Sequence, residues 1–141
     1  MGIKMLIVDD EPVICQGLKL TMPWSELGVE VIGEAYDGLE AMRYILEDSV
    51  DLVLTDIKMP GMDGLHLVKT ANKEKPDVHF VMMSGYDEFE YARQAIRLGV
   101  KDYLMKPIDI DELTELVKRL VVQIKHDKSE GEQSQEENRK Q

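Results

Sequence analysis

The stretch MLIVDDEP, residues 5–12, decides how the rest of the sequence is interpreted. Its first four residues are all apolar, which is typical of a short strand buried on both faces. The strand ends on two carboxylates, Asp9 and Asp10, and Glu11 follows directly. Pro12 then suits the first turn of a helix. The stretch therefore predicts a buried strand, a carboxylate-rich turn and a helix.

The same alternation recurs along the chain. Apolar, largely β-branched runs predict further strands at residues 29–33, 52–54, 78–83 and 101–104, and the segments between them carry apolar residues at helical spacing. Asp37, Asp87 and Asp109 each stand three residues before a Glu and are expected to cap helices, and Gly99 is expected to end one. Five strand–helix units predict an α/β fold with a doubly wound, five-stranded parallel sheet. The order 2-1-3-4-5 of flavodoxin-like proteins is adopted for it.

A length of 141 residues suits one domain. Residues 126–141 contain no aliphatic side chain and no Phe, Tyr or Trp. Such a segment buries too little apolar surface to offset its ordering entropy. We therefore expect a folded domain over residues 1–125, and a disordered polar tail or the start of an interdomain linker over residues 126–141.

Composition argues against membrane, secreted and nucleic-acid-binding proteins. No apolar run approaches the ~20 residues that span a bilayer, and the first residues lack the features of a secretory signal. A cytoplasmic protein without membrane association is expected. The net charge of −11, from 28 acidic and 17 basic residues, disfavours direct nucleic-acid binding by this segment. It suits a metal cation or a basic partner surface, although solubility alone would also explain it.

Polar side chains stand where the predicted strands end. Asp9 and Asp10 follow the first strand, Asp56 the third, Ser84 the fourth and Lys106 the fifth. Ligands of doubly wound sheets bind beyond the carboxyl ends of the strands, so these side chains are expected to share one crevice. Each of them alone would also fit a helix cap, a turn or a solvated loop. Their joint occurrence at four strand ends favours a functional site.

The residue types indicate the chemistry of that site. Three close carboxylates repel one another unless a cation lies among them. Oxygen ligands without His or Cys select a hard ion, and an open site favours Mg²⁺. The ammonium of Lys106 can hold a phosphoryl oxygen. One carboxylate can then attack phosphorus and form an acyl phosphate.

Four motifs carry a family resemblance. They are LIVDDEP (6–12), DIKMPGMDG (56–64), Ser84-Gly85 and Lys106-Pro107. In this order and spacing they resemble the receiver domains of two-component response regulators, over nearly all of residues 1–125. A receiver is a signalling module, and no enzyme activity is expected beyond its own Mg²⁺-dependent phosphorylation and dephosphorylation.

The resemblance implies roles for individual residues. Asp56 would be the phosphoacceptor for a sensor histidine kinase. Asp10, Asp56 and the main-chain carbonyl of Lys58 would bind Mg²⁺, with Asp9 acting through water; Mn²⁺ or Ca²⁺ would substitute in vitro. The remaining roles are phosphoryl binding by Ser84 and Lys106, a switch formed by Ser84 and Tyr103, and a cis peptide bond between Lys106 and Pro107.

A finer resemblance concerns the output. The segments PWSELG (23–28) and GYDEFEYA (85–92) are similar to receivers attached to AraC-type helix-turn-helix regulators. The expected output is transcription regulation through a DNA-binding domain absent from this chain. The alternative is a stand-alone receiver acting by protein contacts. Phosphorylation is expected to favour a homodimer through the fourth helix, fifth strand and fifth helix.

Two rival classes fit less well. A phosphatase of the haloacid-dehalogenase type needs a second Asp two residues after its nucleophile, and Lys58 stands there. A flavodoxin needs a Ser/Thr/Gly-rich phosphate loop after the first strand, where Asp9, Asp10 and Glu11 would repel a phosphate.

Overall fold

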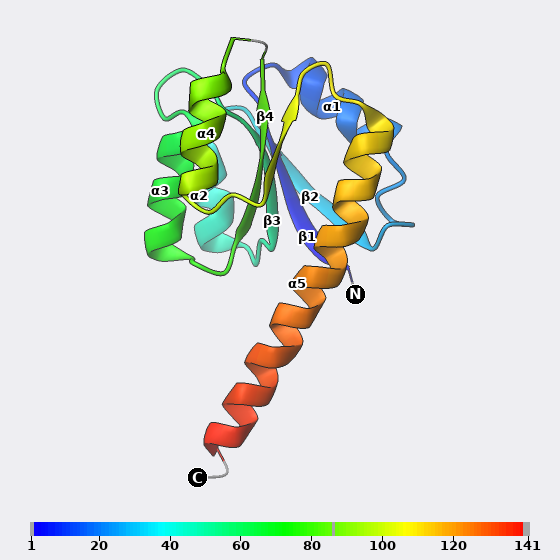
Figure 1. Ribbon diagram of the computed structural model, residues 1–141, viewed down its shortest axis with the longest axis vertical. Helices are drawn as coiled ribbons and strands as arrows, with labels where there is room; N and C mark the ends of the chain where they lie inside the picture. Colours follow the sequence, from blue (N-terminus) through cyan, green and yellow to red (C-terminus); the bar gives the residue numbers. More distant parts are fainter. Residues whose placement is uncertain (1, 86, 140–141) are drawn as a thin grey trace.

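The structure, a computed structural model, describes residues 2–85 and 87–139. One parallel sheet has the strand order β2-β1-β3-β4-β5 (Figure 1). The predicted fold class and strand order are therefore confirmed. The strands are β1 (Ile3–Val8), β2 (Val29–Ala35), β3 (Leu52–Asp56), β4 (His79–Ser84) and β5 (Asp102–Met105). The helices are α1 (Pro12–Thr21), α2 (Gly38–Glu47), α3 (Gly64–Glu74), α4 (Phe89–Arg97) and α5 (Ile110–Arg139).

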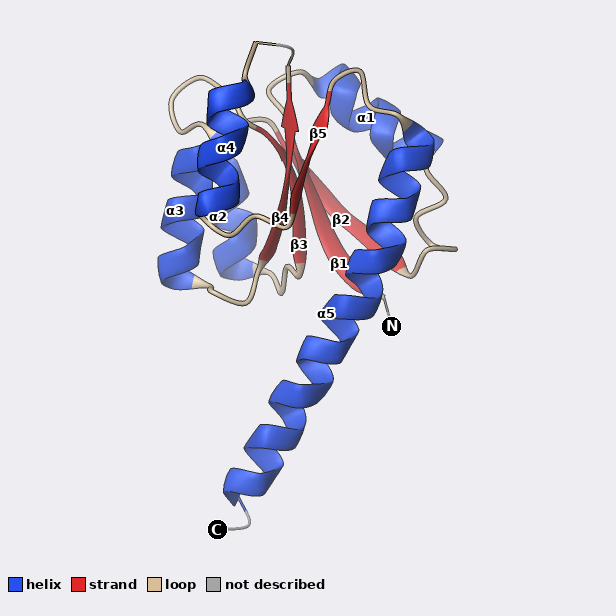
Figure 2. Cartoon of the chain, in the orientation of Figure 1, coloured by secondary structure: helices blue, strands red, loops and turns tan. Residues whose placement is uncertain are grey.

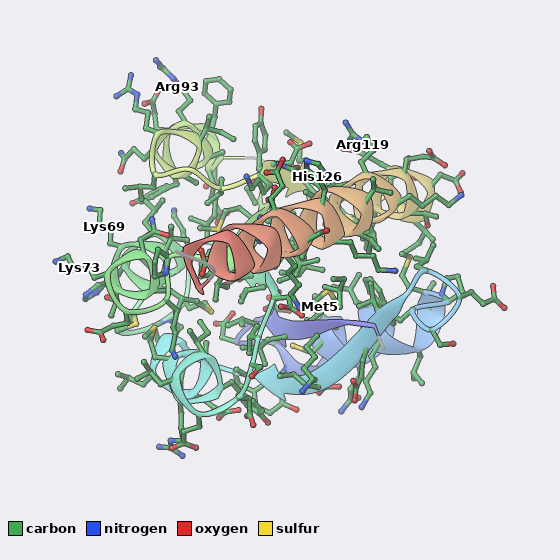
Figure 3. The ribbon with its side chains drawn as sticks, turned by 90° about the horizontal axis from the view of Figure 1, so that it is seen from below. Met5, Lys69, Lys73, Arg93, Arg119 and His126 are labelled. Atoms are coloured by element: carbon green, nitrogen blue, oxygen red, sulfur yellow. The ribbon has the colours of Figure 1, made fainter. Side chains whose placement is uncertain are left out.

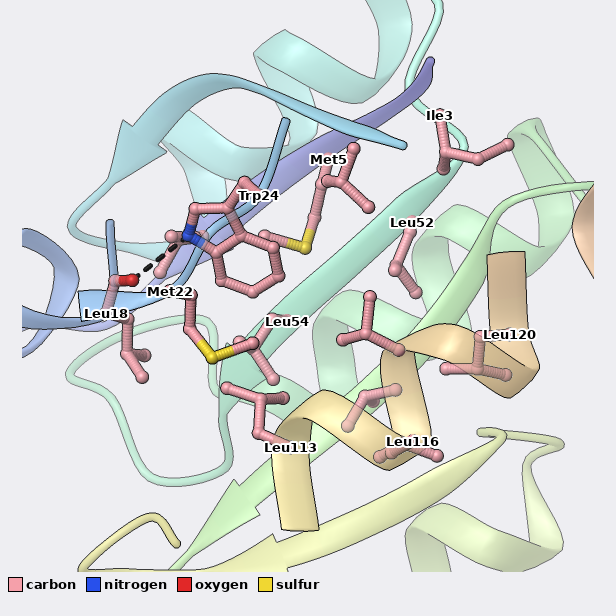
Figure 4. Close-up of a cluster of buried hydrophobic side chains, with 14 of the residues drawn as sticks. Ile3, Met5, Leu18, Met22, Trp24, Leu52, Leu54, Leu113, Leu116 and Leu120 are labelled. Atoms are coloured by element: carbon pink, nitrogen blue, oxygen red, sulfur yellow. Dashed lines mark hydrogen bonds between the residues drawn. The ribbon is translucent and has the colours of Figure 1, made fainter. Parts of the chain in front are cut away.

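Helices cover both faces of the sheet. Figure 2 shows α2, α3 and α4 on one side and α1 and α5 on the other. Each side has its own buried apolar cluster. On the α1–α5 side, Trp24 packs among aliphatic side chains and its indole N–H donates to the carbonyl of Leu18 at 3.0 Å (Figure 4). Because β1 and β3 lie inside the sheet and are covered twice, they are apolar almost without interruption.

Helix caps fix where the loops begin. Asp37 accepts from the amide of Glu40, Asp109 accepts from the amide of Glu112, and Gly99 follows α4 with a φ of +93°. The predicted cap at Asp87 is wrong. The helix begins one residue later than predicted: Glu88 is the N-cap residue of α4, and its amide donates to the carbonyl of Gly85.

The end of the chain also differs from the prediction. Residues 126–141 were expected to form a disordered polar tail or the start of an interdomain linker. They continue α5 as far as Arg139 and extend away from the body, so this part is helical and not disordered (Figure 1). Residues 140–141 lie outside the described part. The segment is rich in Glu, Gln and Lys, which are strong helix formers, so a helix already nucleated on the sheet can continue without burying apolar surface. Nε2 of His126 lies 3.0 Å from Oε1 of Glu130, and this i,i+4 pair supports the helix. Among the described residues, no helix has the length and apolar character needed to cross a membrane.

Gly64, at the start of α3, is required by close packing. A Cβ there would overlap the carbonyl oxygen of Asp56 and lie 3.0 Å from Cα of Ile57. We expect Gly64→Ala to lower the free energy of unfolding by about 2 kcal/mol, since both obstacles are backbone. Gly17, inside α1, has nothing within 4 Å of its Cβ position. Gly17→Ala should therefore be neutral or stabilising by up to ~1 kcal/mol. Urea unfolding measures both, and equal effects would contradict this packing.

Candidate functional site

The carboxyl ends of the strands bring the predicted side chains together. Asp9 follows β1, Asp56 ends β3, Ser84 ends β4 and Lys106 follows β5. Asp9, Asp10 and Asp56 each offer a carboxylate oxygen within 4.8 Å of the others. Because all the strands are parallel, residues from distant parts of the sequence share this one edge of the sheet.

The three aspartates differ in solvent exposure. Asp9 is 0% exposed and Asp56 is 5% exposed, whereas Asp10 is open to solvent. The ammonium of Lys106 lies 2.9 Å from Oδ2 of Asp9 and 3.4 Å from Oδ1 of Asp56. One positive charge thus faces two buried carboxylates, with a third at the rim, and the cluster keeps a surplus of negative charge.

This surplus perturbs the protonation of two groups. Burial and the neighbouring Asp9 carboxylate raise the pKa of Asp56 to about 6, although Lys106 opposes the shift. Burial acts to lower the pKa of Lys106, but its bonds to Asp9 and Asp56 outweigh burial, and the pKa of Lys106 lies above its ordinary value.

Backbone hydrogen bonds hold the loops around Asp56. The amide of Ile57 donates to the carbonyl of Met83 at 3.1 Å, and the amide of Gly64 donates back to Ile57 at 2.7 Å. The amide of Lys106 donates to the carbonyl of Ser84 at 2.7 Å, and the peptide bond that follows Lys106, to Pro107, is cis. The loops after β3, β4 and β5 are thereby fixed relative to one another.

The other predicted residues surround this centre. The Ser84 side chain is buried, and Tyr103 is half-buried against the α2–α3–α4 side of the core. Lys58 directs its side chain outward, with Nζ 5.1 Å from the ring centroid of Tyr91 on α4.

One residue of the site was missed from the sequence. The carboxylate of Glu88 accepts from the amide of Gly85 at 2.7 Å, directly beside Ser84. In the sequence Glu88 is an acidic residue four positions after Ser84, and it stands between the capping candidate Asp87 and its partner Glu90, so no local pattern distinguishes it.

The donor set fits a hard divalent cation. All the side-chain ligands at the cluster are carboxylate oxygens, and the exposed Asp10 leaves one side open to water. Mg²⁺ prefers such a site, with few protein ligands and several waters.

Similarity to known proteins identifies the class. Residues 5–118 match the response regulator receiver domain family, and the chain belongs to this family. It is the receiver domain of a two-component response regulator. The predicted family is therefore confirmed.

Particular relatives refine this picture. The chain is 44% identical to the receiver domain of AraT, a response regulator from Geobacillus stearothermophilus, with a TM-score of 0.78, covering 94% of this chain and 99% of that one. It is 40% identical to the transcriptional regulatory protein YesN of Bacillus subtilis and 39% identical to HptR of Staphylococcus aureus. These matches cover 86% and 84% of this chain, but only 33% and 46% of the relatives. The chain thus spans a third to about half of the length of these curated relatives.

The raised pKa of Asp56 predicts that ionisation of this carboxyl lowers the free energy of unfolding as the pH rises. Below about pH 4 the carboxyl is protonated in both states, so the cost is absent. As the pH rises to about 6, only the unfolded state ionises and the folded state loses stability. In chelator, the stability of Asp56→Asn relative to wild type should therefore grow by about 2 kcal/mol over this range, since a full pKa unit corresponds to roughly 1.4 kcal/mol and the unfolded carboxyl is already partly ionised at pH 4. Urea unfolding from pH 4 to 7.5 measures the difference. Asp77→Asn, at an exposed position, is the control, and parallel curves for all three proteins would contradict the prediction.

Proposed function

We propose that Asp56 is the phosphoacceptor of this receiver and takes its phosphoryl group from a sensor histidine kinase. The observation that carries the proposal is the buried Asp56 carboxylate, flanked by Asp9, Asp10 and the Lys106 ammonium. A nucleophile held in such a crevice needs positive charge around the phosphoryl oxygens but no separate general base.

The transfer is a displacement at phosphorus. An Oδ atom of Asp56 attacks the phosphorus of a phosphohistidine, the O–P bond forms, and the N–P bond breaks. The electron pair of that bond stays on the imidazole nitrogen, and the product on Asp56 is an acyl phosphate. Lys106 and Ser84 would hold the phosphoryl oxygens. Asp10, Asp56 and the Lys58 carbonyl would bind Mg²⁺, with Asp9 acting through water, and the ion would neutralise carboxylate and phosphoryl charge.

The proposed output is transcription regulation in the cytoplasm. AraT, YesN and HptR are named as a response regulator and two transcriptional regulatory proteins, and another similar structure, 36% identical with a TM-score of 0.79, is a two-component regulator AraC of Clostridium phytofermentans. The receiver would occupy residues 1–125. The helical segment beyond it would begin the linker to an AraC-type DNA-binding domain. A stand-alone receiver acting through protein contacts is the alternative.

The proposed surface for homodimerisation is the face formed by α4, β5 and α5. It carries exposed apolar side chains at Ile96 and Met105. Within residues 2–85 and 87–139, β5 pairs with β4 alone and is an edge strand of the sheet. Figure 3 shows Arg93 and Arg119 pointing outward from α4 and α5. Charges of both signs, which suit pairing about a two-fold axis, come from Arg93, Arg97, Lys101, Asp102, Glu112, Glu115 and Arg119.

Labelling tests the phosphoacceptor. With acetyl phosphate and Mg²⁺, the protein should gain one phosphoryl group at Asp56, because its carboxylate lies 3.4 Å from the Lys106 ammonium and keeps some solvent access, whereas Asp9, 2.9 Å from that ammonium, is fully buried. Intact-mass spectrometry and peptide mapping detect the adduct. Chelator should abolish labelling, Lys106→Ala should slow it at least tenfold, and the distant Asp77→Asn should label normally. Full labelling of Asp56→Asn at another residue would remove Asp56 from this role.

Sedimentation tests the dimer surface. The beryllofluoride-activated protein should dimerise at micromolar concentrations, while the unactivated protein stays monomeric. Tyr103→Ala and Arg119→Glu should weaken the dimer at least tenfold, whereas Arg43→Glu, on the far helix α2, should not. An activated protein that remains monomeric at high micromolar concentration would exclude this surface as a self-association site for the isolated chain.

A further inference from the structure

The loop between β4 and α4 is closed by a reciprocal pair of hydrogen bonds. The amide of Gly85 donates to Oε2 of Glu88 at 2.7 Å, and the amide of Glu88 donates to the carbonyl of Gly85 at 3.2 Å. Glu88 is the N-cap residue of α4, yet its side chain caps none of the helix amides. Its carboxylate turns back toward the end of β4, so one residue joins the start of α4 to the residue after Ser84.

The Glu88 carboxylate lies close enough to the aspartate cluster to act on it. Asp56 pairs with Met83 in the sheet, and the amide of Ile57 donates to the Met83 carbonyl, so Gly85 runs beside the loop that follows Asp56. The charge of Glu88 is among those that raise the pKa of Asp56. Glu88 therefore adds a fourth carboxylate to the surroundings of the three aspartates.

A phosphoryl group on Asp56 would need hydrogen-bond donors from the region that the Glu88 carboxylate occupies. It carries close to two negative charges and three strong acceptor oxygens. The Gly85 amide is the backbone donor adjacent to the Ser84 hydroxyl, and in the resting protein Glu88 uses it. Two anions cannot share one amide, and their repulsion in a partly buried crevice is substantial.

We propose that Glu88 is an internal anion that occupies the Gly85 amide in the resting receiver and is displaced when Asp56 is phosphorylated. The inference rests on the proposed function of Asp56 and assigns a positioning residue to it. Displacement of the side chain breaks one of the two hydrogen bonds that hold the start of α4 to the end of β4. The arrival of negative charge at Asp56 is thereby transmitted to α4 through Glu88.

The test compares two charge-neutralising substitutions on α4 and its cap. Glu88→Gln keeps a hydrogen-bond acceptor for Gly85 and removes only the charge. Glu90→Gln removes one charge two residues further on, where Glu90 pairs with the exposed Arg93. The rate of labelling by acetyl phosphate with Mg²⁺, followed by intact mass, should rise roughly three- to tenfold in Glu88→Gln. In Glu90→Gln it should stay within about twofold of wild type.

Each outcome is decisive. A Glu88→Gln rate equal to or below that of Glu90→Gln, with wild type labelled at Asp56, overturns the role of Glu88 alone. Absence of labelling in wild type overturns the phosphoacceptor assignment and this inference together. NMR of the wild-type protein supplies a measurement that needs no variant: on addition of beryllofluoride and Mg²⁺, the Gly85 amide and the Glu88 side-chain carboxyl should both shift. An unchanged Glu88 carboxyl resonance in the activated protein overturns the displacement even if the variant does not fold.

Discussion

The ammonium of Lys106 lies between the carboxylates of Asp9 and Asp56, at 2.9 and 3.4 Å, and the arrangement at this edge of the sheet depends on it. Without it, two buried carboxylates would face each other with no compensating charge, which is among the costliest arrangements in a protein interior. With it, the three aspartates and Lys106 together are still two positive charges short of neutral. The folded protein therefore maintains a site with uncompensated negative charge, which a divalent cation would neutralise. The uncompensated carboxylate charge lowers the stability of the folded protein at the same site that can bind a cation and react. Such perturbed groups are common at functional sites.

Much of this arrangement could be predicted from the sequence because parallel sheets obey simple geometry. Once residues 5–8 and 52–54 are recognised as inner strands, Asp9 and Asp56 must lie at the same edge. Strand order follows only from the analogy with flavodoxin-like proteins, since the local sequence contains no information on which strands pair. The Lys106–Asp9 bond joins residues 97 positions apart and follows only when that order is known.

The errors share a physical cause. At Asp87, a good capping pattern competes with the two hydrogen bonds between Glu88 and Gly85, and these contacts with the end of β4 determine which residue begins α4. Beyond Lys125, low hydrophobicity predicts disorder for an isolated segment, but the cost of helix nucleation has already been met by the part of α5 packed on the sheet. In both places the neighbouring structure, and not the local composition, determines the conformation.

The length of α5 has a mechanical consequence. The last buried residue of α5 in the body is Ile124, and the helix continues to Arg139, about 22 Å further at 1.5 Å per residue. Near its base, Lys128 lies 2.8 Å from Asp51 and Asp127 lies 3.4 Å from His79, at the edge of the sheet opposite the aspartate cluster. These contacts set the direction in which the helix leaves the body. The protruding part is therefore a helical extension whose base is held by the body. A tilt of about 10° at this base would move the end of the helix by roughly 4 Å.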